Sequence, residues 1–152
     1  MVIHMNFKPN GAATVIGSFP HEKETDACAL VFESLRDIPA WPQLPRRSFL
    51  EDMNVQFCKR LPCLALNEAE RKAGFDTSRD MAGELERFYT HFIEDDVDYF
   101  GLDDDHAAGF ACFIQGVRDG RAAGALALKG ETTGPLTLGL MTDITDGKYA
   151  LY

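Results

Sequence analysis

Two short apolar runs, each ending at a glycine, constrain the fold more than any other feature of the chain. They cover residues 12–17 (AATVIG) and 125–130 (ALALKG). Apolar runs of this length that are bounded by glycine are typical of strands buried inside a sheet. The sequence therefore predicts two buried strands, one near each end of the chain.

Stretches with helical spacing of apolar residues fill the space between these runs. Residues 27, 30, 31, 35 and 38 are apolar and lie on one helical face, and acidic residues precede them, where the helix dipole favours negative charge. Further helices are predicted after Ser48, from Thr77 or Ser78, from Asp103 or Asp104 to Gly120, and from Pro135. Residues 61–66 are a weak strand candidate, and the polar residues 67–79 predict a loop.

A proline-rich segment, residues 39–47 (PAWPQLPRR), follows the first predicted helix. Its prolines exclude a helix and a central strand, so we predict an ordered or extended loop. Such a loop could present the indole of Trp41, the amide of Gln43 and the two guanidiniums of Arg46 and Arg47 to an anionic or aromatic ligand. The alternative is a stiff connection in which the indole of Trp41 fills part of the core.

The order of strand, helix, loop, helix and strand is typical of an α/β fold with parallel strands. Residues 17–21 (GSFPH) follow the first predicted strand, and Lys129 and Glu131 lie at the end of the second. Ligands of parallel α/β folds bind at the carboxyl ends of the strands. Both places are candidate sites, with a plain tight turn and a surface ion pair as the respective alternatives.

Length and charge exclude several classes of protein. The chain has 152 residues, which suits one domain, and its net charge is −9. An acidic chain is poorly suited to nucleic acid or anionic lipid, and no apolar run is long enough to span a membrane. No secretory signal is visible at the N-terminus, so we expect a cytoplasmic protein with reduced cysteines.

The run Asp103, Asp104, Asp105, His106 suggests a metal site at first sight. Consecutive residues at a helix start point in different directions, so they cannot all face one ion. Capping of the following helix explains these acids better, and no metal site is predicted within the chain.

Three of these segments, in order, resemble one enzyme superfamily. Residues 14–20 (TVIGSFP) resemble the opening strand and loop of the catalytic barrel of cobalamin-independent methionine synthase. Residues 39–47 stand where uroporphyrinogen decarboxylases carry a substrate loop containing Trp and Arg. Residues 130–137 (GETTGPLT) resemble a strand-to-helix turn found in both families.

The resemblance implies a partial (β/α)8 TIM barrel, in which residues 1–152 form the N-terminal portion with parallel strands and flanking helices. It further implies a methionine-synthase-like methyltransferase of methionine biosynthesis that transfers a methyl group from a donor to a small thiol such as homocysteine. Zinc would then be held in a later part of the parent protein, not in this chain. The implied substrate-binding residues are Ile16, Gly17, Ser18, His21, Trp41, Gln43 and Arg47.

Two alternatives stay open. One is a uroporphyrinogen-decarboxylase-like enzyme or a corrinoid-dependent methyltransferase, although Arg46 and Arg47 adjoin here and the decarboxylase pattern separates its arginines. The other is a non-catalytic, self-associating fragment. A partial barrel would expose strand edges and apolar interior, so we expect a homo-oligomer. The chain alone is expected to be inactive.

Overall fold

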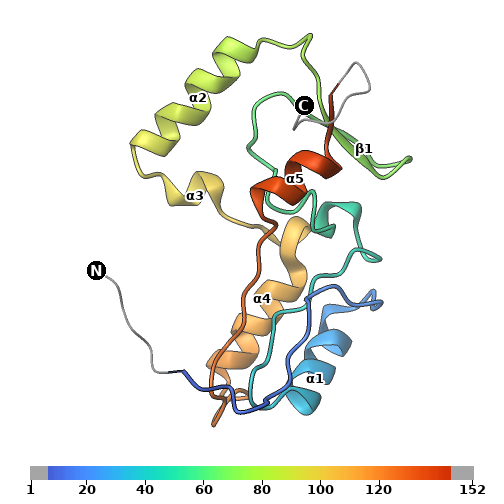
Figure 1. Ribbon diagram of the computed structural model, residues 1–152, viewed down its shortest axis with the longest axis vertical. Helices are drawn as coiled ribbons and strands as arrows, with labels where there is room; N and C mark the ends of the chain where they lie inside the picture. Colours follow the sequence, from blue (N-terminus) through green and yellow to red (C-terminus); the bar gives the residue numbers. More distant parts are fainter. Residues whose placement is uncertain (1–6, 145–152) are drawn as a thin grey trace.

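The computed structural model describes residues 7–144 (Figure 1). The elements, in chain order, are α1 (Glu24–Ser34), the 3-10 helix η1 (Phe49–Glu51), β1 (Leu64–Asn67), β2 (Lys72–Phe75), α2 (Met81–Ile93), α3 (Val97–Phe100), α4 (Asp104–Arg118), α5 (Pro135–Met141) and β3 (Asp143–Ile144). Helices α1 and α4 pack together in one half of the molecule, and the sheet and the arm formed by α2 and α3 make up the other half.

The core lies between α1 and α4. The rings of Phe32 and Phe113 stack with their centroids 5.2 Å apart, and Cys28 and Val31 are fully buried beside them. A Cβ atom at Gly116 would lie 2.5 Å from the ring of Phe32, so a glycine is required there for the two helices to approach. The predicted apolar face is thus only partly right: Ala27 and Val31 are buried, but Leu30 is 43% exposed, and residues 35 and 38 lie beyond the end of α1.

Local capping signals set most helix starts. The side chain of Ser48 accepts a hydrogen bond from the amide of Leu50, and Asp103 caps α4 in the same way at the amide of His106. Pro135 occupies the first turn of α5, as predicted. The start of α2 differs, because Asp80 rather than Thr77 or Ser78 caps it.

The sheet has the order β1-β2-β3. Strands β1 and β2 form an antiparallel hairpin in which Leu64 lies opposite Phe75 and Asn67 opposite Lys72. Strand β3 pairs in parallel with the end of β2 over two residue pairs. Strand β2 lies within residues 67–79, so the prediction of a loop there is wrong.

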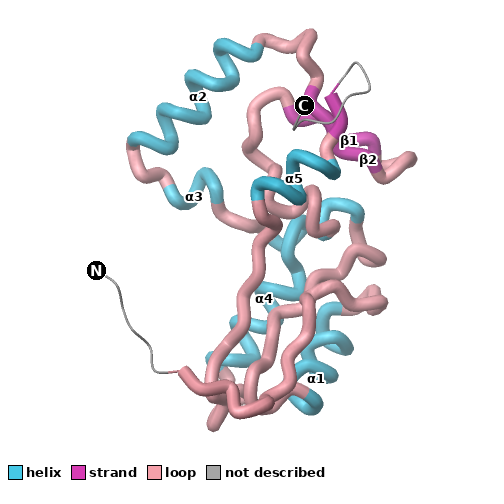
Figure 2. The backbone as a smooth tube through the Cα atoms, in the orientation of Figure 1, coloured by secondary structure: helices cyan, strands magenta, loops and turns pink. Residues whose placement is uncertain are grey.

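The predicted fold class is also wrong. The elements are mostly helices, and the main strand pair is an antiparallel hairpin, so the described residues do not form a parallel-strand portion of a (β/α)8 TIM barrel. The predicted strands over 12–17 and 125–130 are absent as regular strands. Figure 2 draws both segments as loops. Single parallel bridges join Ser18 to Gln43 and Ala40 to Lys129.

Proline explains why these extended segments form no regular ladder. Segment 38–44 lies between the other two, and its residues Pro39 and Pro42 have no backbone N–H to donate. Burial also departs from expectation, since the side chain of Ile16 is 77% exposed. A middle segment that can donate only at some of its positions gives isolated bridges instead of a strand.

The arm formed by α2 and α3 packs loosely. Neither helix, both of which lie wholly within the described residues, has a buried residue, and Phe92 and Ile93 are largely exposed. Phe88 and Phe100 contact each other edge to face across the bend, with ring centroids 5.3 Å apart. Between residues 7 and 144, no helix combines the length and the apolar character needed to cross a bilayer.

Candidate functional site

Three extended segments meet where the sequence predicts a site. The amide of Gln43 donates to the carbonyl of Gly17 at 2.6 Å, and the amide of Phe19 donates to the carbonyl of Gln43 at 2.9 Å. On the other side of the middle segment, the amide of Lys129 donates to the carbonyl of Pro39 at 2.9 Å. These bonds bring together Gly17, Ser18, Gln43, Lys129 and Glu131, which we call the corner.

Glu131 is the most unusual residue of the corner. One oxygen of its carboxylate, Oε2, lies 3.0 Å from the ammonium of Lys129, which also bonds the carbonyl of Val15. The other oxygen, Oε1, is buried and has no hydrogen-bond donor among the described residues. A buried carboxylate oxygen without a donor is costly, so this atom marks a place where a donor group would be stabilised.

Glu131 also explains why residue 17 is a glycine. A Cβ atom at Gly17 would lie 1.6 Å from Oε1 of Glu131 and 3.1 Å from the carbonyl oxygen of Trp41. The carboxylate therefore occupies the space that any side chain at position 17 would fill. The pair joins the ends of two segments that are more than a hundred residues apart in the sequence.

Gln43 is held by a buried chain of amide hydrogen bonds. Its Nε2 donates to Oε1 of Gln56 at 2.8 Å, and Nε2 of Gln56 donates to the carbonyl of His106 at 2.6 Å. Both glutamines are essentially buried. The hydroxyl of Ser18 lies 3.5 Å from Oε1 of Gln43, which is long for a hydrogen bond, and Ser18 itself is exposed. The hydroxyl is thus available to a ligand.

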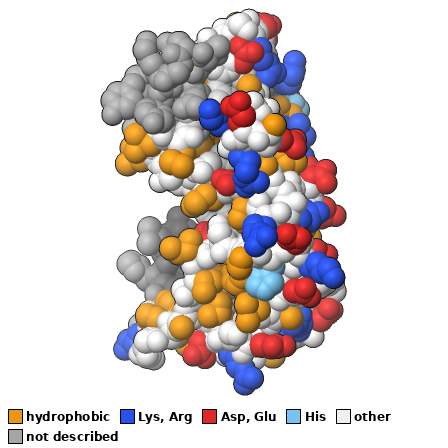
Figure 3. All heavy atoms as spheres, turned by 90° about the vertical axis from the view of Figure 1, so that its right-hand side faces the viewer, with side chains coloured by type: hydrophobic (Ala, Val, Ile, Leu, Met, Phe, Trp, Pro, Cys, Tyr) orange, Lys and Arg blue, Asp and Glu red, His pale blue; other side chains and the backbone are white. Residues whose placement is uncertain are grey.

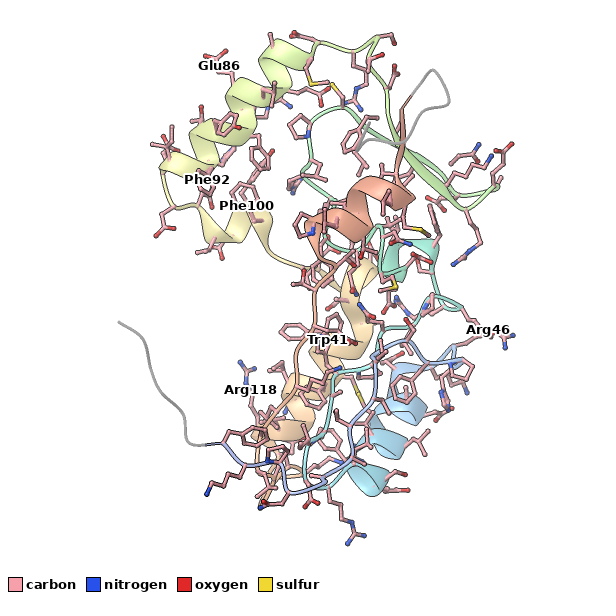
Figure 4. The ribbon with its side chains drawn as sticks, in the orientation of Figure 1. Trp41, Arg46, Glu86, Phe92, Phe100 and Arg118 are labelled. Atoms are coloured by element: carbon pink, nitrogen blue, oxygen red, sulfur yellow. The ribbon has the colours of Figure 1, made fainter. Side chains whose placement is uncertain are left out.

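Trp41 belongs to the core rather than to an open pocket wall. Its side chain is 4% exposed, and its ring meets the rings of Phe57 and Phe110 edge to face at 6.5 and 5.3 Å. Figure 4 shows Trp41 between its own segment and α4. This placement favours the alternative in which the indole fills part of the core. Trp41 is still near the corner, because its Nε1 would lie 3.9 Å from a Cβ atom at Gly130.

The remaining predicted residues lie around the corner without forming part of it. Ile16 presents its side chain to solvent, while His21 is half-buried and its Nδ1 has no partner in the described part of the chain. Nη1 of Arg47 bonds Glu51 at 2.7 Å and the carbonyl of Asp104 at 3.3 Å. The guanidinium of Arg47 is therefore paired with the buried carboxylate of Glu51. The sequence did not indicate this pairing.

Burial dominates the electrostatics of Glu51. Its side chain is fully buried, and burial raises its pKa above the ordinary value, while the guanidinium of Arg47 opposes that rise. Glu51 and Gln56 could not be singled out from the sequence, because both lie in a short amphipathic stretch, where glutamate and glutamine usually face water.

The described residues hold no group of three or more His, Cys, Asp or Glu side chains that could bind a metal ion. The capping interpretation of Asp103 agrees with its contacts, since its Oδ1 lies 2.6 Å from Nδ1 of His106 and its Oδ2 contacts Lys59. Zinc in a longer parent protein stays a prediction.

The comparisons with known proteins identify no relative. No protein-family model, no curated protein and no solved structure matches the chain. The function must therefore be argued from the residues themselves.

Proposed function

We propose that the corner binds the ammonium end of a small molecule, such as the amino-acid part of a thiol substrate. The observation that carries this proposal is Oε1 of Glu131, buried and without a donor among the described residues. A ligand ammonium that reached this oxygen would donate to it, as Lys129 already does to Oε2 of the same carboxylate. The exposed hydroxyl of Ser18, whose contact with Gln43 at 3.5 Å is long, adds a second polar group to the corner.

Methyl transfer to a thiol such as homocysteine is the reaction that the three sequence motifs suggest, and it stays a prediction. The barrel that the resemblance implies is absent from the described residues, so the proposal depends on the corner and not on the fold. The chemistry would need a group that holds the thiol as thiolate, such as the zinc expected in a later part of the parent protein.

Trp41 gives the binding test an internal reporter, because it is the single tryptophan of the chain and lies beside Gly130. Homocysteine and 4-mercaptobutyrate are titrated under reducing conditions while tryptophan fluorescence is followed. The two compounds differ only in the ammonium group. We expect homocysteine to bind at least about tenfold more tightly, which is the value of one charge-assisted contact.

The variant Glu131→Gln keeps the size of the side chain and removes its charge, so it should abolish this preference. Glu86→Gln is the matched control, since Glu86 points away from the rest of the molecule on α2 (Figure 4). Equal affinity for the two compounds, or an unchanged preference in the Glu131 variant, would show that the corner does not bind an ammonium group.

A second candidate function is self-association, as a non-catalytic module. Ile16, Leu126 and Leu128 are about half exposed or more, and all three lie on the extended segments. Figure 3 shows hydrophobic side chains gathered in the lower half of one face of the molecule. Exposed apolar groups on neighbouring segments favour pairing with a second copy of the chain. Sedimentation velocity across a hundredfold range of concentration tests this, and a monomer throughout would contradict it.

We also propose the cytoplasm as the compartment of this protein. All four cysteines are free, and three of them are buried. Burial raises the pKa of Cys58 to about 11, which keeps that thiol protonated and unreactive. Free thiols that persist in this number suit a reducing compartment.

A further inference from the structure

Basic side chains cluster at a second place in the molecule, although the chain as a whole is acidic. Four cations and one acid line a cavity of about 330 Å³ between β1, the arm and the turn that precedes β1. The cations are Lys59, Arg60, Arg79 and Arg87, and the acid is Glu84. We call this cavity the cationic cleft. It is separate from the corner, since none of its lining residues belongs to the corner.

The charged residues of the cationic cleft and Tyr99 come from four parts of the chain. Lys59 and Arg60 come from the turn before β1, Arg79 precedes α2, Glu84 and Arg87 lie one turn apart on α2, and Tyr99 comes from α3. Their convergence cannot be read from the sequence, where the hairpin of β1 and β2 separates Lys59 and Arg60 from Arg79 and Arg87. Tertiary structure therefore concentrates a positive field on a protein of net charge −9.

The existing contacts of these cations leave donors unused. Arg79 bonds Glu84 at 2.5 Å, and Lys59 contacts Asp103, so these two are paired. Arg60 donates through Nε to the carbonyl of Tyr99 at 3.0 Å, and its terminal nitrogens have no partner within residues 7–144.

The side chain of Arg87 has no hydrogen bond or ion pair within the part of the chain that the structure describes, and it is exposed at the cleft. An arginine carries five N–H donors arranged to bind two oxygens at once. The cleft therefore offers two incompletely used guanidinium groups to an incoming anion.

The surroundings favour a compact ligand. His91 stacks on the ring of Tyr99 with centroids 3.7 Å apart, and the guanidinium of Arg60 lies 4.8 Å from the same ring. The ring is thus already covered and offers no platform to an aromatic ligand. The volume lies at the lower end of small-molecule pockets, which span roughly 300–1,000 Å³. The net negative charge of the chain opposes a long polyanion.

We propose that the cationic cleft binds a small molecule carrying two or more phosphate or carboxylate groups, held by Arg60 and Arg87. Arg79 and Lys59 contribute to the field while their own carboxylates hold them in place. The oxygens of the ligand accept hydrogen bonds from the guanidinium N–H groups that have no partner within the described residues. The cleft would thus have a binding function of its own, independent of the corner.

Calorimetric titration of the whole chain with inorganic pyrophosphate and, separately, with citrate tests the proposal at low ionic strength. We expect saturable one-to-one binding of at least one of the two, weakened by added salt. Binding of pyrophosphate alone assigns a phosphate ligand, and binding of citrate alone assigns a carboxylate ligand. Binding of both shows that the cleft recognises several anionic oxygens, whether these belong to phosphate or to carboxylate groups. Absence of binding at millimolar concentrations of both would overturn the proposal.

Arg87→Gln is the decisive variant, because a residue without protein partners can be changed without loss of folding. It should weaken binding about tenfold or more. Arg118→Gln is the matched control, since Arg118 is exposed at the far end of α4 (Figure 4). Affinity unchanged in the Arg87 variant, or an equal loss in the control, would show that no such site exists.

Discussion

Two glycines allow segments that are far apart in the sequence to lie in close contact, because a Cβ atom at either position would collide with the other segment. A Cβ atom at Gly109 would lie 1.9 Å from the carbonyl oxygen of Pro42, and one at Gly17 would meet the carboxylate of Glu131. The obstacle at Gly109 is backbone, which cannot move aside, whereas the obstacle at Gly17 is the end of a side chain. Gly109 is therefore the stricter requirement.

Gly109→Ala is expected to lower the free energy of unfolding by about 2 kcal/mol. Overpacking costs up to about 3 kcal/mol, and the better helix propensity of alanine returns about 1 kcal/mol. Urea denaturation followed by circular dichroism measures the change. Gly134→Ala is the control, because nothing lies within 4 Å of its Cβ position, and it should change stability by less than about 1 kcal/mol.

Arg47→Met is expected to destabilise the protein more at neutral than at acidic pH. Burial raises the pKa of Glu51, so ionising this group costs stability; the cost is absent below the ordinary value of 4.5 and complete above the folded pKa. Removing Arg47 leaves that charge unpaired. The loss should be about 2 kcal/mol at pH 7, below the 3–5 kcal/mol of a fully buried pair because Arg47 is partly exposed.

The same urea experiment at pH 5 should show a smaller loss, since Glu51 can then take up a proton. Arg46→Met is the control: Arg46 lies at the edge of the molecule (Figure 4), 3.6 Å from the exposed Glu22, and should change stability by less than about 1 kcal/mol at either pH. Equal losses at both pH values in the Arg47 variant would contradict this account of Glu51.

At the scale of elements, α2 and α4 differ in what holds them. Helix α4 buries residues along one face, including Phe113 and Gly116, whereas no residue of α2 is buried over its whole described length. Figure 4 shows Phe92 and Phe100 where α2 meets α3, apart from the core around Trp41. Helical stability in proteins comes mainly from packing, so α2 is the weaker element.

Native-state hydrogen exchange should therefore show α2 opening at a lower free energy than α4. Asp80→Ala removes the cap of α2, whose side chain accepts from the amide of Gly83, and should lower protection in α2 by about 1 kcal/mol while α4 is unchanged. Equal protection of both helices in the unaltered protein would mean that the arm unfolds only with the whole chain.

At the scale of the whole molecule, the ionised carboxylates of three aspartates make the stability of the fold sensitive to acid. Lys59 and His106 lower the pKa of Asp103, the amide of Tyr99 and His91 lower that of Asp96, and the hydroxyl and amide of Ser78 lower that of Asp76. A lowered pKa means that each ionised carboxylate stabilises the folded state above its ordinary value of 3.8. That contribution is lost as the pH falls through the folded pKa.

Stability should therefore fall steeply below about pH 4, as urea midpoints at pH 5, 4 and 3 will show. Asp103→Asn keeps a capping side chain but loses the charge, so its midpoint should be lower at pH 5 and fall less steeply. Asp105→Asn, at an exposed position with no partner in the described chain, is the control and should follow the unaltered protein. Identical slopes for all three proteins would contradict the role of Asp103.

The sequence by itself determined the features that are encoded locally. The starts of η1, α4 and α5 follow from Ser48, Asp103 and Pro135, because capping and proline geometry act within a few residues. The family resemblance, rather than any local pattern, put Gly17 and Gln43 in one set of substrate-binding residues, and their binding role stays a prediction. Neither the resemblance nor a local pattern indicated that Glu131 has a buried carboxylate oxygen without a donor among the described residues.

Only the tertiary structure decided how the segments pair. The hairpin of β1 and β2 was missed because its turn residue with positive φ is Arg71 rather than glycine or asparagine. The parallel sheet was wrongly expected because periodicity reports burial and not the hydrogen-bond donors that Pro39 and Pro42 lack. The burial of Glu51 and the convergence of four cations likewise depend on contacts between distant residues, which no local pattern encodes.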